Sequence, residues 1–258
     1  MSREVVLVVA IGLVGGVTSG LLGVGGGIVM VPGLVALGHL ARTRAHASSL
    51  AAILPIAVVG TAVYAGRGEV DYGLFGFLSI GSVLGAPLGV RLLARLSERV
   101  VLLLFDGIVV AAAIRLLLPA SGADAHVSSG LGLEVALISI GVGLIAGAMA
   151  GLLGVGGGAL LVPAMVVLLE RSQHVAAGTS LAVIIPTAIA GSIANARRGF
   201  LGARDAALLS LGGVFGAVGG ALLALEVDET LLRKLFAVFL LVLAVKSLAR
   251  GKDAEVSP

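Results

Sequence analysis

The chain alternates between long apolar runs and short polar stretches over almost its whole length. Eight apolar runs lie at about 4–40, 46–65, 72–93, 100–118, 131–169, 175–196, 206–225 and 231–248. Six of these runs have about 18 to 22 residues, the length that an α-helix needs to cross a bilayer once. The pattern predicts an all-α polytopic membrane protein.

The last four runs repeat the first four. One constant shift along the chain, called the repeat shift below, places Gly20 on Gly151, Pro32 on Pro163, Ser49 on Ser180, Pro55 on Pro186 and Gly85 on Gly216 without a gap. Such duplication is a common plan of secondary transporters. We expect a first transmembrane repeat at 1–118, a linker at 119–130, a second repeat at 131–250 and a polar tail at 251–258. Because the first run recurs inside the chain, we expect a membrane segment there and not a cleaved signal peptide.

The first run of each repeat is too long for one crossing and contains a glycine-rich motif. The motif Gly-Leu-Leu-Gly-Val-Gly-Gly-Gly occupies 20–27 and again 151–158. Successive glycines are poor helix formers, so we expect a broken or re-entrant helix at each motif. Inside a membrane, free backbone groups are tolerated only where they are buried in protein or line a cavity. The motifs therefore predict a binding site near the membrane midplane.

The charges between the runs indicate how the repeats are oriented. If each long run reverses at its glycines, the repeats are inverted, and twelve Lys and Arg lie on the side of the termini. The other side then carries five, namely Arg67, Arg115, Arg171, Arg233 and Lys234. If each long run is a single crossing, the division is nine against eight. The positive-inside rule favours inverted repeats with both termini in the cytoplasm.

Composition supports the membrane assignment and excludes other classes. The chain is 59% hydrophobic and 12% charged, whereas a soluble domain carries about 25% charged residues. The net charge is +3, but no basic run is long enough to follow a nucleic-acid backbone, so we expect no nucleic-acid partner. The chain has no cysteine and no His-x-x-x-His or Glu-x-x-His pair. We therefore expect no metal, no cofactor and no enzymatic activity.

The apolar stretch after each motif would begin with unpaired amides and a partial positive charge. Two such helix N-termini facing one cavity would bind an anion without a buried Lys or Arg. The expected ligand groups are the amides of Gly25, Gly26, Gly27, Gly156, Gly157 and Gly158 and the hydroxyls of Ser48, Ser49, Thr179 and Ser180. Two alternatives stay open: the glycines serve close helix packing alone, or the hydroxyls cap or back-bond their own helices.

Asp106 is an acidic residue in the middle of an apolar run, and the repeat shift places it on Ala237. A carboxyl group at membrane depth is costly and is by default a functional hypothesis. We consider it a candidate for proton coupling. The alternative is a purely structural role, in which the carboxyl group pairs with a polar neighbour.

The pattern Gly-x-Gly-Gly-Gly-x-x-x-x-Pro occurs twice, and each copy is followed by a hydroxyl pair and Leu. With this pattern the chain, from about Val5 to Leu248, resembles the TauE/SafE family of sulfite and organosulfonate exporters. The resemblance implies a membrane permease for sulfite, sulfoacetate or related small anions. The first repeat departs from the family pattern, because His46-Ala-Ser-Ser-Leu50 replaces the Gly-Thr-Ser-Leu form.

These observations predict a secondary transporter that exports a small anion, with sulfite or a sulfur-containing organic acid as the preferred candidates. We expect a multi-pass protein of the inner (plasma) membrane, with the lipid bilayer and the anion as partners; a homo-oligomer is compatible with the sequence. Two alternatives come from other classes. One is a membrane-embedded assembly or accessory subunit, and the less favoured one is an intramembrane enzyme.

Overall fold

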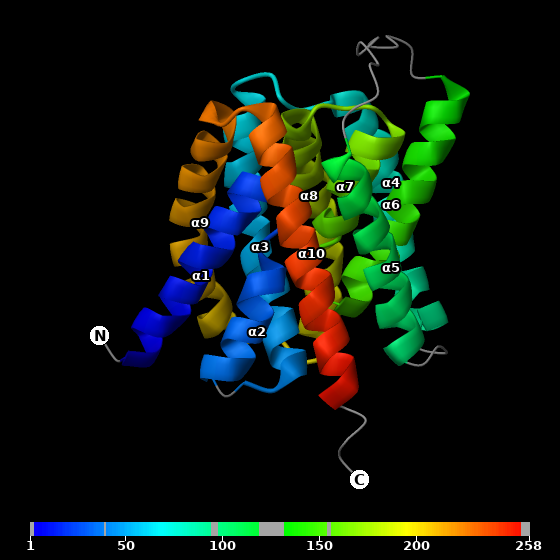
Figure 1. Cartoon of the computed structure of the whole chain (residues 1–258). Helices are drawn as coiled ribbons and strands as arrows, with labels where there is room; N and C mark the ends of the chain where they lie inside the picture. Colours follow the sequence, from blue (N-terminus) through cyan, green and yellow to red (C-terminus); the bar gives the residue numbers. More distant parts are fainter. Residues whose placement is uncertain (1–2, 39, 94–97, 119–131, 154–155, 254–258) are drawn as a thin grey trace.

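The structure is a computed structural model of the chain, and it describes residues 3–38, 40–93, 98–118, 132–153 and 156–253. These residues form ten α-helices and no strand (Figure 1). The helices are α1 (Arg3–Leu22), α2 (Gly27–Gly38), α3 (Arg42–Ala65), α4 (Tyr72–Leu93), α5 (Glu98–Leu117), α6 (Leu133–Leu153), α7 (Gly158–Leu168), α8 (Gln173–Arg197), α9 (Ala203–Glu226) and α10 (Glu229–Asp253).

The helices meet the requirements of a multi-pass membrane protein. Five of them, α1, α3, α6, α8 and α9, are long and apolar enough to cross a bilayer. Large apolar side chains lie on the outer surface, among them Leu137, Phe215 and Val242, which are 61%, 69% and 60% exposed. Such exposure would be unfavourable in water, but it suits contact with lipid tails.

The glycine-rich motifs interrupt the helices. Gly23, Gly25 and Gly26 have φ angles of 72°, 82° and 72°, which lie in the left-handed region that residues with a side chain rarely adopt. After this break α2 folds back along α1, because a Cβ on Gly33 would meet Ile11 and a Cβ on Gly15 would meet Met30. Helix α2 has 12 residues, about 18 Å, and is too short to span a layer of about 30 Å.

The two halves of the chain interlock. Helix α1 packs on α9, and α6 packs on α4. A Cβ on Gly12 would overlap the carbonyl of Leu209, and a Cβ on Gly143 would overlap the carbonyl of Leu78. The repeat shift places Gly12 on Gly143 and Leu78 on Leu209, so the second contact is the first one with the partners exchanged between the halves. Each half therefore provides the partner for the first helix of the other half.

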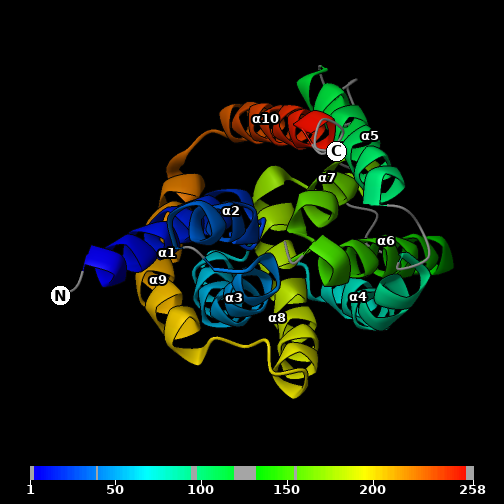
Figure 2. The ribbon, with the colours of Figure 1, turned by 90° about the horizontal axis from the view of Figure 1, so that it is seen from below.

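Helices α3 and α8 pack together in the middle of the bundle, between the α1–α9 pair and the α4–α6 pair (Figure 2). Their contact also repeats at equivalent positions: Leu181 packs on Gly60, and Leu50 packs on Gly191. Helices α5 and α10 pack on each other at the edge of the bundle (Figure 2). Both breaks lie beside α8, because a Cβ on Gly23 would meet Ala177 and a Cβ on Gly156 would be 3.9 Å from Ile184.

Candidate functional site

The two glycine-rich breaks lie against each other. A Cβ on Gly156 would be 3.8 Å from the Val24 carbonyl oxygen and 3.9 Å from the Cα of Gly25. A Cβ on Gly158, the first residue of α7, would come too close to Gly23 and Val24. The equivalent segments of the two repeats thus meet backbone to backbone.

The amides at the start of α2 and α7 have no partner among the described residues. The carbonyl of Gly26 accepts hydrogen bonds from the amides of Val29 and Met30, and that of Gly157 accepts from Leu160 and Leu161. In the described part of the chain, no hydrogen bond uses the amides of the six candidate glycines: Gly25, Gly26, Gly27, Gly156, Gly157 and Gly158. All six glycines are buried. Buried amides without a partner are rare, and a ligand can satisfy them.

One of the candidate hydroxyls bonds to a break. Ser180 Oγ donates to the carbonyl of Gly23 at 2.8 Å, from α8 of the second half to the break of the first half. Ser49, the residue equivalent to Ser180, is fully buried, and its Oγ has no partner among the described residues. Ser19, in the last turn before the first break, is buried with an unpaired Oγ as well.

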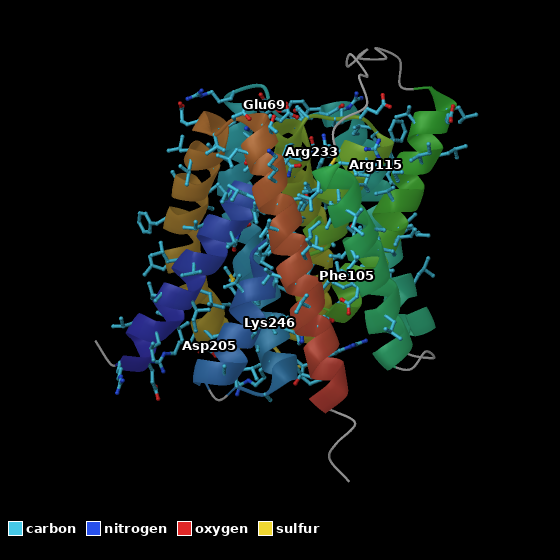
Figure 3. The ribbon with its side chains drawn as sticks, viewed as in Figure 1. Glu69, Phe105, Arg115, Asp205, Arg233 and Lys246 are labelled. Carbon is cyan, nitrogen blue, oxygen red and sulfur yellow. The ribbon has the colours of Figure 1, made fainter. Side chains whose placement is uncertain are left out.

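The other two candidate hydroxyls bond to loops at opposite ends of the bundle. Ser48 Oγ donates to the carbonyl of Gly202 at 3.3 Å, and the amide of Asp71 donates to Thr179 Oγ1 at 2.9 Å. Gly202 precedes α9, whose first-turn residue Asp205 lies at the lower end in Figure 3. The two members of the second pair therefore have different partners: Ser180 bonds to the first break, and Thr179 bonds to the loop before α4. In the first pair, Ser48 bonds to the loop before α9.

Asp106 lies apart from the breaks, on α5 at the edge of the bundle. Its side chain is 3% exposed, and Oδ1 has no partner among the described residues. The hydroxyl of Ser247 on α10 hydrogen-bonds the carboxyl group. Its neighbour Phe105 is labelled in Figure 3. Among the described residues Asp106 is the only buried charged residue, so the surroundings of the breaks draw their polarity from backbone groups and hydroxyls.

Two contacts near the site were not anticipated. Tyr64 Oη, fully buried at the end of α3, donates to the carbonyl of Gly20 at 2.9 Å, and Arg171 pairs with Asp71 at 3.0 Å. Asp71 directly precedes an apolar run, a position where an acidic residue often caps a helix; it accepts from the amide of Leu74 at 2.9 Å. The capping position of Asp71 was therefore visible in the sequence, whereas its partner Arg171 was not.

Within the described residues, no group of three His, Cys, Asp or Glu could hold a metal.

Comparison with known proteins agrees with this architecture. The family model described as "Sulfite exporter TauE/SafE" matches residues 2–116 and 139–257. A Bacillus subtilis (strain 168) protein described as "Probable membrane transporter protein YunE" is 28% identical over 186 residues, which are 63% of this chain and 67% of the relative. A Xylella fastidiosa (strain 9a5c) protein described as "Probable membrane transporter protein" is 34% identical over 107 residues, 41% of each chain.

These matches confirm the resemblance seen in the glycine and hydroxyl motifs, and the match in two parts is in line with repeats. They also confirm that the protein is a transporter and not an enzyme, and that it is a multi-pass membrane protein. The chain belongs to the TauE/SafE sulfite exporter family of membrane transporters.

Proposed function

We propose that the protein is a secondary transporter which exports a small anion, sulfite or a sulfur-containing organic acid, and that the anion binds between the two glycine-rich breaks. The observation that carries the proposal is the meeting of the two breaks at Gly156 and Gly25, with the amides on both sides unpaired. The family name supports the substrate class.

The proposed site works through backbone dipoles. The amides of residues 25–27 and 156–158 lie at the N-termini of α2 and α7, where the helix dipole adds roughly half a positive charge. Two such ends attract an anion without a buried Lys or Arg, so the site stays uncharged when empty. Ser49 completes the shell from α3, and Ser180 donates to the anion from α8 when it releases the carbonyl of Gly23. Ser48 and Thr179 hold the loops at the two ends.

Inverted repeats would allow alternating access. In Figure 1, α1 begins at the lower end and α6 begins at the upper end, so the two equivalent helices run in opposite directions. This direction, together with the excess of Lys and Arg on one side, supports inverted repeats in the inner membrane with both termini in the cytoplasm. The two halves would rock against each other around the breaks.

Asp106 is the proposed proton carrier. It lies on the α5–α10 pair, and Oδ1 of its carboxyl group has no partner in the part of the chain that the structure describes. The substitution Asp106→Asn should leave anion binding unchanged and abolish export driven by a pH gradient in proteoliposomes. Export by Asp106→Asn at the wild-type rate would exclude this role.

The main test is stabilisation of the purified protein in detergent by sulfite, sulfate, thiosulfate, sulfoacetate, acetate and chloride. A ligand that binds the native state alone stabilises it by about 2.7 kcal/mol at a hundred times its dissociation constant. We expect a selective rise in melting temperature with one sulfur oxyanion, which should be lost in Gly156→Ala and kept in Gly219→Ala, where a Cβ meets open space. No rise with any anion would count against the site and against an anion as the substrate of this transporter.

A further inference from the structure

An ion pair joins the two halves at the upper end of the molecule. Arg171, between α7 and α8, places Nε 3.0 Å from Oδ2 of Asp71, between α3 and α4. Glu69, two residues before Asp71, is labelled at the upper end in Figure 3, opposite to the start of α1. The side chains of Arg171 and Asp71 are 20% and 23% exposed. The pair is therefore part-buried and lies at the upper end of the molecule.

Asp71 uses only one edge of the guanidinium group. Among the described contacts, the side chain of Arg171 makes one hydrogen bond, from Nε. The two Nη groups have no protein partner in the part of the chain that the structure describes. Guanidinium N–H groups form a planar fork that matches two oxygens of a carboxylate or a sulfur oxyanion. The free edge is a potential anion site.

The backbone before Arg171 is strained. Glu170 has a φ of 51°, in the left-handed region that a residue with a Cβ rarely adopts. The amide of Arg171 donates to the carbonyl of Met165 at 3.1 Å and so ties this connection to the end of α7. Strain of this kind persists where the surroundings fix the backbone, and it clusters at ligand sites. Arg171 therefore follows a left-handed residue just after the end of α7, and its amide is bonded to that helix.

The lower end of the molecule has a different arrangement at the equivalent positions. The repeat shift places Asp71 on Gly202 and Arg171 on Leu40, so neither charge has a charged counterpart. At the lower end the carbonyl of Gly202 accepts from Ser48 Oγ. The upper end therefore carries an ion pair, whereas the equivalent position at the lower end carries a hydroxyl–carbonyl hydrogen bond.

The ion pair is connected to the breaks through α8. The amide of Asp71 donates to Thr179 Oγ1, and the next residue, Ser180, donates to the carbonyl of Gly23. Two successive residues of α8 thus contact Asp71 and the first break. Asp71 is thus bonded through its backbone amide to the residue before Ser180.

We propose that Arg171 forms a second, weaker anion site at the upper end of the molecule, in which the Asp71 carboxylate competes with the ligand for the guanidinium group. The ligand class is the small sulfur oxyanion, so the inference rests on the proposed function for the identity of the ligand. The anion binds the two Nη groups of Arg171 and weakens the ion pair between Arg171 and Asp71. Because the carboxylate of Asp71 neutralises the guanidinium charge, the anion binds weakly and can leave again.

Calorimetric titration of the purified full chain with methanesulfonate tests the proposal. We expect two components in the wild-type protein. Arg171→Lys keeps a positive charge near Asp71 but loses the planar fork, so the weaker component should lose affinity by about tenfold or more. Asp71→Asn keeps an oxygen for the amide of Leu74 and removes the competing charge, so the same component should gain affinity. The control is Arg67→Lys, because Arg67 makes an exposed ion pair with Glu226 at 3.3 Å.

The outcomes separate this site from the central one. Loss of a component in Arg171→Lys but not in Gly156→Ala would support the upper site even if the central site fails. Loss in Gly156→Ala alone, with Arg171→Lys like the wild type, would overturn the upper site and leave the central one standing. Weaker binding in Asp71→Asn, or equal losses in Arg67→Lys and Arg171→Lys, would overturn it as well. No binding of methanesulfonate to the wild-type protein would overturn the upper site, and the central site would then be decided by the stabilisation test with the other anions.

Discussion

At the scale of single residues, the glycines of the breaks serve two separable purposes. Gly26 has a φ of 72°, and a Cβ there would also overlap the carbonyl of Gly15. Gly157 is its equivalent, with a φ of 76° and the carbonyl of Ala146 at 2.9 Å from a Cβ. Gly156 has a φ of 86°, but a Cβ there would make only ordinary contacts. Alanine at Gly26 or Gly157 therefore disturbs packing, whereas alanine at Gly156 mainly places a methyl group between the breaks.

Gly156→Ala and Gly26→Ala should therefore differ in stability. We expect Gly156→Ala to lower the free energy of unfolding by about 1–2 kcal/mol, the cost of a left-handed residue with a Cβ. Gly26→Ala should cost about 1–3 kcal/mol more, because the overlap with Gly15 is added. Thermal unfolding in detergent measures both. A Gly26→Ala protein as stable as Gly156→Ala would contradict the packing described here.

The serine pair at equivalent positions permits a second comparison. Ser180→Ala leaves the carbonyl of Gly23 without its described side-chain partner, which should cost about 1–3 kcal/mol. Ser49→Ala removes a buried hydroxyl that has no described partner, so its stability should stay within about 0.5 kcal/mol of the wild type or rise. The melting temperatures of the two variants, measured without ligand, check this. A larger loss in Ser49→Ala would show that its hydroxyl has a partner after all.

At the scale of helices, close approach of backbones holds the two halves together. Glycines of α1 and α6 face carbonyls of α9 and α4 at equivalent positions. In lipid, burial of apolar surface provides little drive for association, so close packing between small residues carries much of it. The interface of α1 with α9 and that of α6 with α4 should therefore contribute similar stability.

Gly12→Ala and Gly143→Ala test this equivalence. Each methyl group would overlap a backbone carbonyl, that of Leu209 or of Leu78, and should destabilise the protein by about 1–3 kcal/mol. The control is Gly219→Ala in α9, where a Cβ meets nothing within 4 Å. There the higher helix propensity of alanine should stabilise by up to about 1 kcal/mol. If all three variants melt alike, close glycine contacts do not determine the stability of the bundle.

At the scale of the whole molecule, the proposed topology can be tested because the chain has no cysteine. Arg67→Cys and Arg198→Cys occupy exposed, repeat-equivalent positions in the connections α3–α4 and α8–α9. Inverted repeats place these two positions on opposite sides of the membrane. A thiol reagent that does not cross membranes should label Arg67→Cys in intact cells and Arg198→Cys only after permeabilisation. Labelling of both from one side would exclude inverted repeats.

The sequence by itself determined which segments become helices and where they break. An apolar run of about 20 residues can satisfy its backbone in lipid only as a helix, and residues such as Tyr72 and Leu93 bound both the predicted run and α4. The breaks at Gly23–Gly26 and before Gly158 were predictable, because glycine tolerates positive φ and weakens helices. The duplication and the family motifs were also visible without a structure.

The tertiary structure decided which helices are partners and which way the hydroxyls face. All the runs are similarly apolar and rich in glycine, so their patterns do not specify that α1 packs on α9 of the other half. Thr179 and Ser180 are neighbours in sequence, but successive residues of an α-helix point about 100° apart. One therefore reaches Asp71 and the other Gly23. The pairing of Arg171 with Asp71 joins residues 100 positions apart, and such contacts depend on the packing of whole helices and not on local sequence.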